Sequence, residues 1–156
     1  MSGFITRGWQ VSRVIAAKVC ATELDRATST VLTAVPNCSH KLLAGKTYII
    51  EAHITGTATA NGGAKAAIVG DGVLTANFFT LRGTNTNNAT TNAVSTTTTL
   101  GNAVAGSTSV MTDMILLGSI SVNVGGVATL EFAQNASHSD TSSVYVGSYV
   151  KFTPID

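Results

Sequence analysis

The clearest pattern in this chain is an alternation of apolar and polar residues, which recurs in short runs between turn signals. It is cleanest over residues 47–54, where Tyr48, Ile50, Ala52 and Ile54 share one face of an extended chain. A period of two sustained over eight residues is typical of a β-strand. The alternation therefore predicts a strand with one buried face at this position.

Similar runs on both sides of residues 47–54 predict further strands. They are bounded by Gly, Pro, Asn and Asp, the residues that favour turns. The predicted strands cover residues 30–35, 64–69 and 73–81, and the predicted turns are Pro36-Asn37, Leu43–Lys46, Asn61–Gly63 and Gly70–Gly72. Residues 12–21 fit either a helix, because they are rich in Ala, or a strand, because strands follow. A polar break is expected from Glu23 to Ser29.

The segment from Ile115 to Asp156 contains three strand-like runs separated by two turn signals. Three sets of apolar residues are each expected to share a face: Ile120, Val122 and Val124; Ala128, Leu130 and Phe132; and Val144, Val146, Val150 and Phe152. Tyr145 and Tyr149 point to the side opposite those last valines. A strand that is apolar on both faces must be covered on both sides. We therefore predict that Tyr145 and Tyr149 contact a neighbouring subunit, with ordinary packing in a second core as the alternative.

The number and spacing of these runs predict an all-β fold. About eight to ten short strands with regular turns are typical of an antiparallel β-sandwich. The jelly roll is the favoured version, because strands occupy the chain ends and no βαβ alternation occurs. The length of 156 residues fits one domain, placed at residues 26–156 after an N-terminal arm and first strand at 1–25. Residues 84–99, of which 13 are Thr, Asn or Ser, form either an exposed loop or an edge strand.

Composition changes this picture by pointing to assembly. Charged residues are only 11% of the chain, and Thr occurs 24 times. A surface built from Thr, Ser and Asn suits a protein that contacts copies of itself or another assembly. The net charge of +1 provides no field to attract nucleic acid or an anionic membrane, so neither is an expected partner. No apolar window reaches membrane-spanning length, and the protein is expected to be made and assembled in a cytoplasm.

The sequence offers no convincing catalytic or metal-binding pattern. His138, Ser139 and Asp140 are adjacent, whereas a Ser–His–Asp relay needs separate segments that converge. The three histidines are dispersed, so we expect no metal, no cofactor and no enzymatic activity. Cys20 and Cys38 are interpreted as two buried, reduced thiols, although a disulfide between them stays possible on spacing alone.

The N-terminal segment carries a cluster of basic and aromatic residues ahead of the first acid. The cluster consists of Phe4, Arg7, Trp9 and Arg13. It is either a solvated tail or a short arm that docks on an acidic or mixed partner surface, with Trp9 as the anchor.

Three short motifs carry a resemblance to a known family. They are an L-A-G-K-T-Y run within Leu43–Tyr48, A-Q-N at Ala133–Asn135, and G-S-Y at Gly147–Tyr149. Over about residues 28–156 the chain resembles a jelly-roll domain found in structural proteins of tailed bacteriophages. Such domains are similar to trimeric jelly rolls of the tumour-necrosis-factor type.

The resemblance implies a homotrimeric capsid decoration, or cement, protein that binds the capsid surface and stabilises the head. Its partners would be its own copies and the major capsid protein, and its location would be the virion surface. The short stretch before the domain favours decoration, with Phe4, Arg7, Trp9 and Arg13 gripping the capsid. The alternative is a tail-tip or receptor-binding module in which residues 84–99 contact a host-surface glycan.

Overall fold

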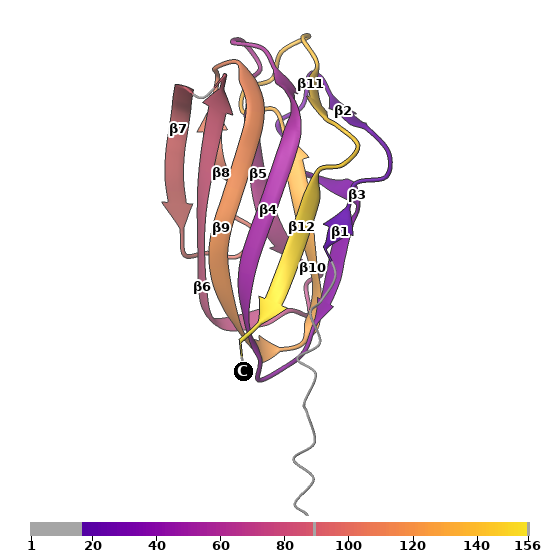
Figure 1. Cartoon of the computed structure of the whole chain (residues 1–156), viewed down its shortest axis with the longest axis vertical. Helices are drawn as coiled ribbons and strands as arrows, with labels where there is room; N and C mark the ends of the chain where they lie inside the picture. The colour runs from indigo at the N-terminus through magenta and orange to yellow at the C-terminus, as the bar shows by residue number, and fades with distance from the viewer. Residues whose placement is uncertain (1–16, 89, 156) are drawn as a thin grey trace, which may run out of the picture.

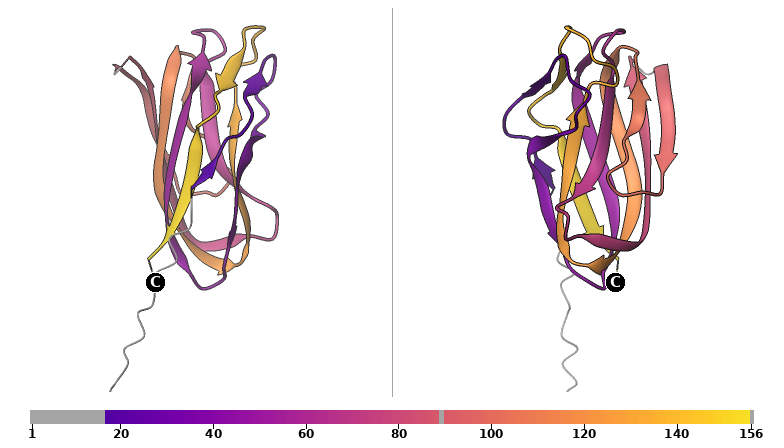
Figure 2. Two further views of the ribbon diagram at one scale, coloured as in Figure 1. Left: turned by 45° about the vertical axis from the view of Figure 1, so that its right-hand side comes forward. Right: turned by 180° about the vertical axis from the view of Figure 1, so that it is seen from behind.

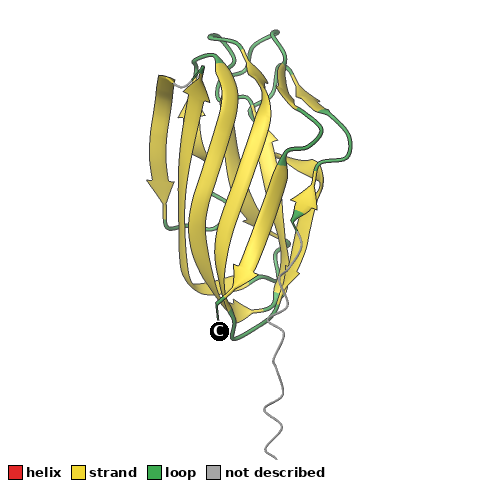
Figure 3. Ribbon diagram, viewed as in Figure 1, coloured by secondary structure: helices red, strands yellow, loops and turns green. Residues whose placement is uncertain are grey.

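The computed structural model describes residues 17–88 and 90–155, and within these ranges the protein is built from strands and loops with no helix (Figure 3). In chain order the strands are β1 (Lys18–Val19), β2 (Leu24–Arg26), β3 (Thr33–Leu42), β4 (Thr47–Ala58), β5 (Ala64–Gly70), β6 (Thr75–Asn87), β7 (Thr90–Thr97), β8 (Val104–Ser107), β9 (Met111–Val124), β10 (Gly126–Ala133), β11 (Ser142–Val144) and β12 (Tyr149–Pro154). The all-β prediction is confirmed.

These strands form two antiparallel sheets that face each other as a sandwich (Figures 1 and 2). The large sheet has the order β1-β12-β4-β9-β6-β7, and β11 joins it beside β4, with β2 paired to β11. The small sheet has the order β3-β10-β5-β8. The small sheet covers one face of the large sheet and leaves the other face open in the monomer.

The core lies between the two sheets, and the alternation read from the sequence supplies it. Tyr48, Ile50, Ala52 and Ile54 of β4 are all buried, as predicted. From β10, Ala128, Leu130 and Phe132 are fully buried, and they face the large sheet from the other layer. Burial of each large apolar side chain contributes about 1.5–3 kcal/mol, so this layer is the main source of stability.

The predicted turn at Pro36-Asn37 is wrong, because β3 continues through it as a bulge. Opposite β3, Thr129 pairs with Ser39 and Glu131 with Ala34, so several residues of β3 face a single residue of β10. Asn37 has a φ of 62°, a conformation that Asn tolerates better than most residues. Proline lacks a backbone N–H, and a bulge is one of the few strand positions where no ladder bond is lost.

The last predicted strand run is two strands, β11 and β12, with a turn between them. Val144 and Val150 are buried as expected, but Val146 is 62% exposed and does not share their face. Gly147, with a φ of 95°, makes the turn, and Ser148 lies fully buried after it. In the first run, Val124 is also exposed, whereas Ile120 and Val122 are buried.

The Thr/Asn-rich residues 84–99 adopt the second of the two predicted forms, an edge strand. They complete β6 and then form β7, which pairs with β6 alone at one margin of the large sheet (Figure 1). Threonine is β-branched and suits a half-exposed strand, so a polar edge forms without a supply of core residues.

The N-terminal part of the described chain is joined to the large sheet. β1 pairs with β12, and β2, inside the predicted polar break, pairs with β11. Of the ambiguous residues 12–21, the structure shows a strand at Lys18–Val19, and residues 12–16 lie outside the described part.

Candidate functional site

The outer face of the large sheet is the surface that the small sheet does not cover, and its centre is apolar. It is defined here by the outward side chains of Ile49 on β4, Ile115 and Leu117 on β9, and Val94 on β7. These side chains are between 38% and 53% exposed. Register places Ile115 next to Thr84 of β6, which in turn pairs with Val94, so the apolar residues lie across neighbouring strands. A sheet face of this composition is typical of a surface that another molecule covers.

Two pairs of charged groups lie on the outer face, and a further charged residue, Arg82, is exposed beside Leu117 with no ion pair among the described residues. His53 Nε2 lies 2.8 Å from Asp113 Oδ1, and Lys151 Nζ lies 3.1 Å from Glu51 Oε2. Both pairs are half-exposed, and each contributes little to the stability of the monomer. The Lys151–Glu51 pair brings opposite charges together, which lowers the cost of covering that part of the face.

Both predicted contact tyrosines lie against outward-facing residues of β4. Tyr149 is half-buried, and its ring meets the ring of His53 edge-on with centroids 6.2 Å apart. Tyr145 is 38% exposed, and its hydroxyl is 3.4 Å from Oγ1 of Thr57. The structure therefore places Tyr145 and Tyr149 on the same side of the large sheet, with Tyr149 beside the apolar centre. Their predicted role in a subunit contact stays a prediction.

The predicted docking residues Phe4, Arg7, Trp9 and Arg13 lie outside the described residues. The first described strand, β1, lies at the margin of the large sheet.

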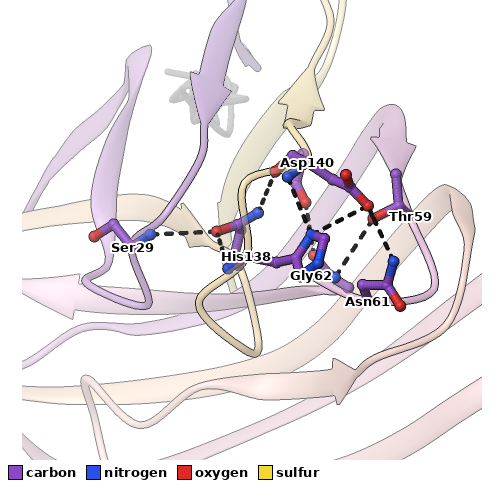
Figure 4. A network of polar contacts seen from close by, with 9 residues as sticks. Ser29, Thr59, Asn61, Gly62, His138 and Asp140 are labelled. Atoms are coloured by element: carbon purple, nitrogen blue, oxygen red, sulfur yellow. Dashed lines mark hydrogen bonds and ion pairs between the residues drawn. The ribbon is translucent and has the colours of Figure 1, made fainter.

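A second feature is a network of polar contacts that includes Ser29, His138 and Asp140 (Figure 4). The buried residue that these three share as a partner is Gln134. The side chain of Gln134 is fully buried. Its Oε1 accepts hydrogen bonds from the backbone N–H groups of Ser29 and His138, and its Nε2 donates to the carbonyl oxygen of Asp140. A Cβ at Gly62 would lie 2.6 Å from Nε2, so glycine leaves the room that the Gln134 amide needs.

The carboxylate of Asp140 extends this network to the β4–β5 turn. Its Oδ2 accepts hydrogen bonds from Oγ1 of Thr59 at 2.8 Å and from Nδ2 of Asn61 at 3.3 Å. His138 Nδ1 is 3.2 Å from the same oxygen. His138 and Asp140 therefore have a structural role, because the Asp140 carboxylate joins their loop to the β4–β5 turn.

Two features are absent from residues 17–88 and 90–155, the part of the chain that the structure describes. No group of three or more His, Cys, Asp or Glu side chains lies close enough there to hold a metal ion. The same residues contain no helix that could cross a membrane.

Cys20 and Cys38 are free, buried thiols, as the preferred interpretation predicted. The Cys20 thiol donates to the carbonyl oxygen of Thr22 and that of Cys38 to Lys18. Burial, aided by the neighbouring Cys20, raises the pKa of Cys38 to about 11.

We expect Cys38 to resist alkylation in the folded protein. Only the thiolate reacts, and a pKa near 11 lowers its population at pH 8 by about two orders of magnitude relative to an ordinary cysteine. Burial adds a steric barrier. Peptide mass spectrometry after iodoacetamide treatment, with and without urea, measures the rate. Equal rates in both conditions, or a native disulfide, would contradict the expectation.

Three titratable side chains, His40, Asp71 and Asp140, stabilise the folded protein more when they are deprotonated than when they are protonated. Burial, with Lys18 nearby, lowers the pKa of His40 below 6.5. Backbone N–H groups of Leu74 and Val127 lower the pKa of Asp71, and hydrogen bonds from Thr59 and Asn61 lower that of Asp140, both from 3.8. A lowered folded-state pKa means that the unfolded chain binds the proton more readily, so acid favours unfolding.

Acidification is therefore expected to lower the melting temperature in two stages. The contribution of His40 is complete above its unfolded pKa of 6.5 and is lost as the pH falls through its folded pKa. The contributions of Asp71 and Asp140 are lost as the pH falls below 3.8. Protonation of the desolvated Glu131, whose pKa is raised above 4.5, adds stability before that stage, as the pH falls toward 4.5. Circular dichroism melts across this range test the order. His40→Phe should remove the first stage only; an unchanged profile in that variant would contradict the assignment.

Comparison with protein-family models, curated proteins and solved structures gives no significant match. One fold class hosts many functions, so the surfaces of this protein, and not its fold, are the guide to its function.

Gln134 belongs to the A-Q-N motif, but the motif by itself does not indicate the hydrogen bonds that the side chain makes. A polar residue directly after a run of apolar strand residues was the available signal. The apolar centre of the outer face was missed at Ile49, Ile115 and Leu117, although the same alternation that defines the core places these residues on the opposite face.

Proposed function

We propose that this protein is a homotrimeric capsid decoration protein of a tailed bacteriophage, which binds the capsid surface and stabilises the head. The observation that carries the proposal is the apolar centre of the outer face, where Ile49, Ile115 and Leu117 are exposed on adjacent strands. A single subunit leaves this surface in water. Association with further copies would cover it.

The strand order supports a jelly roll of the kind that the motifs resemble. With the β6–β7 hairpin treated as an insertion, β1-β12-β4-β9 faces β3-β10-β5-β8. The chain then changes sheet at most successive strands, which is the connectivity of two Greek keys wound into a jelly roll. The insertion widens only the large sheet, at the margin away from β1.

The outer face is large enough for a stable contact. Five strands of the large sheet, β12-β4-β9-β6-β7, are between 6 and 14 residues long. At a spacing of about 4.8 Å, and with a shared span of about eight residues, they form a surface of roughly 24 Å by 27 Å. A stable interface buries about 800 Å² on each partner, which is comparable with this face once side-chain relief is added. The pairs His53–Asp113 and Lys151–Glu51 can be covered together, whereas Arg82 beside Leu117 would need an anionic partner from the neighbouring copy.

The proposed mechanism is that of a brace. Packaged DNA presses outward on the shell, and a trimer that bridges neighbouring capsid subunits adds contacts that must break before the shell opens. A docking contact of about 500 Å² of apolar surface per subunit would contribute roughly 12 kcal/mol before costs. Ordering of the arm and loss of rigid-body freedom offset much of this gain. Three linked contacts then bind far more tightly than one.

Deletion of residues 1–12 is expected to abolish binding to the particle while the trimer stays intact. The deletion removes Phe4, Arg7 and Trp9, the basic and aromatic residues proposed to grip the capsid, but leaves every described strand. Co-sedimentation with undecorated heads measures binding, and light scattering measures the trimer. The matched control replaces Val31, a 69% exposed loop residue, by Ala. Retained binding of the truncated protein would contradict the docking role.

Electron cryo-microscopy of the parent particle tests the location. Density for the trimer on capsid threefold positions is the expected result. Density at the tail would instead support the receptor-binding alternative.

A further inference from the structure

A groove lies at the end of the large sheet where β6 begins. It has a volume of about 510 Å³ and is lined by Leu74, Thr75, Ala76, Asn77, Phe78, Phe79, Thr98, Thr99 and Leu100. Because β6 and β7 are antiparallel and Leu81 pairs with Thr97, the residues after Thr97 run beside those before Leu81. Two segments that are 20 residues apart in sequence thus form the two walls.

A pair of bulges sets the floor of this groove. Along β6 and β9, Thr75 pairs with Val124, Ala76 with Val122, and Phe78 with Ser121. Asn123 is therefore extra on β9, and Asn77 is extra on β6. Bulges of this kind leave a residue unpaired and redirect side chains, and they are frequent next to binding sites.

The bulge places two exposed side chains next to each other. Asn77 is exposed, and the following Phe78 is 54% exposed, whereas Phe79 points inward and is almost fully buried. In a regular strand, Asn77 and Phe78 would point to opposite faces. An aromatic ring of this size in water is a cost to the free protein that a ligand can relieve.

The polar groups of the groove are neutral, and several are available. No lining residue is charged. Asn77, Thr98 and Thr99 are exposed, and their side chains make no hydrogen bond within the described part of the chain. An amide supplies donors and an acceptor, and each hydroxyl supplies both. Leu74, Leu100 and the Phe78 ring supply apolar contact.

We propose that this groove binds a neutral saccharide. A pyranose ring has an apolar C–H face, which can stack on Phe78, and a rim of hydroxyl groups, which can pair with Asn77, Thr98 and Thr99. Pockets that combine an apolar surface with a few converging polar groups are typical of small-ligand sites. The absence of a charged lining residue disfavours phosphorylated, sulfated or acidic sugars. Phe78 pairs with Ser121, four positions along β9 from Leu117, so the groove lies on the outer face beyond its apolar centre.

The test is an NMR titration of the full chain with defined oligosaccharides. Maltohexaose, cellohexaose and hexa-N-acetylchitohexaose are the neutral probes, and a heparin hexasaccharide is the charged comparator. At least one neutral probe is expected to shift the amide resonances of residues 75–79 and 98–100. Phe78→Ala should weaken that binding about tenfold, and Phe78→Trp should retain it. Val31→Ala, at an exposed position outside the groove, should bind like the parent protein.

Three outcomes would overturn the proposal. One is that no neutral probe shifts these resonances. Another is that Phe78→Ala binds as tightly as the parent protein. The third is that heparin binds more tightly than every neutral probe. Because Phe78 is exposed, its replacement by Ala should leave the far-ultraviolet circular dichroism spectrum and the melting temperature close to those of the parent. Loss of binding is then attributable to the groove.

Discussion

If the outer face mediates the proposed trimer, replacement of Leu117 by glutamate is expected to convert that trimer into folded monomers. Leu117 is 53% exposed at the centre of the outer face, between Glu51 on β4 and Arg82 on β6. In the monomer the new carboxylate stays in water and has Arg82 as a neighbour, so the fold should be kept. In an assembly that covers this face, the carboxylate would have to leave water with the single cross-strand cation Arg82 beside it, and the desolvation cost of such a pair can exceed its attraction.

The size of the effect follows from two terms that act in the same direction. Covering a leucine side chain contributes about 1.5–3 kcal/mol, and this gain is lost in every subunit. Burial of an incompletely paired carboxylate adds a desolvation penalty that is several kcal/mol in protein interiors. Since each unit of 1.4 kcal/mol changes the association constant tenfold, subunits at micromolar concentration should separate.

Light scattering coupled to size exclusion measures the outcome, and circular dichroism confirms that the fold is kept. Val31→Glu is the matched control, because Val31 is 69% exposed in the loop before β3, away from the outer face. The control should remain trimeric. A parent protein that is monomeric, or a Leu117→Glu variant with the mass of the parent, would show that this face does not mediate assembly.

Much of the fold follows from period-two alternation, because each strand records which side chains face the core. This holds for β4, where Tyr48, Ile50 and Ile54 are buried, and for β10, where Leu130 and Phe132 are buried. The same pattern also contained the outer face. The alternation does not say whether an outward apolar residue is covered, because single apolar residues are common on protein surfaces.

Other features depend on partners far along the chain and could not be read locally. The bulge at Pro36 and Asn37 exists because β3 must stay in register with β10 on both sides of it. Valine favours strands, but Val146 lies in the turn that connects β11 to β12, next to Gly147 with its positive φ. The groove at Phe78 requires residues 98–100 to lie beside the start of β6, which only the β6–β7 pairing reveals.

The role of Gln134 is the strongest example of such a long-range dependence. Its hydrogen bond to the N–H of Ser29 joins residues that are 105 positions apart. Nothing in the composition of the A-Q-N motif indicates that partner. In the structure, the buried amide of Gln134 holds residues 28–29 and the loop after β10 together. The same loop contacts the β4–β5 turn, because the carbonyl oxygen of Gly62 accepts hydrogen bonds from the N–H groups of Asn135 and Ala136.

Replacement of Gln134 by alanine is expected to destabilise the protein by several kcal/mol. The substitution leaves three backbone groups without a partner: the N–H groups of Ser29 and His138 and the carbonyl of Asp140. An unpaired buried polar group costs about 1–3 kcal/mol, and the vacated volume beside Gly62 adds a cavity penalty unless water fills it. The loss should appear as a lower urea midpoint without a change of slope.

Gln134→Glu separates the loss of the hydrogen-bond donor from the loss of side-chain volume, because glutamate has nearly the same shape as glutamine. Its carboxylate can still accept from Ser29 and His138, but it has no donor for the Asp140 carbonyl and it brings a charge into a buried position near the Asp140 carboxylate. Its pKa should therefore be raised, and the variant should recover stability as the pH is lowered, because protonation restores a donor. The alanine variant has no such group and should show no recovery. If Gln134→Ala unfolds at the urea concentration of the parent, or if both variants respond alike to pH, the amide is not the residue that holds these loops together.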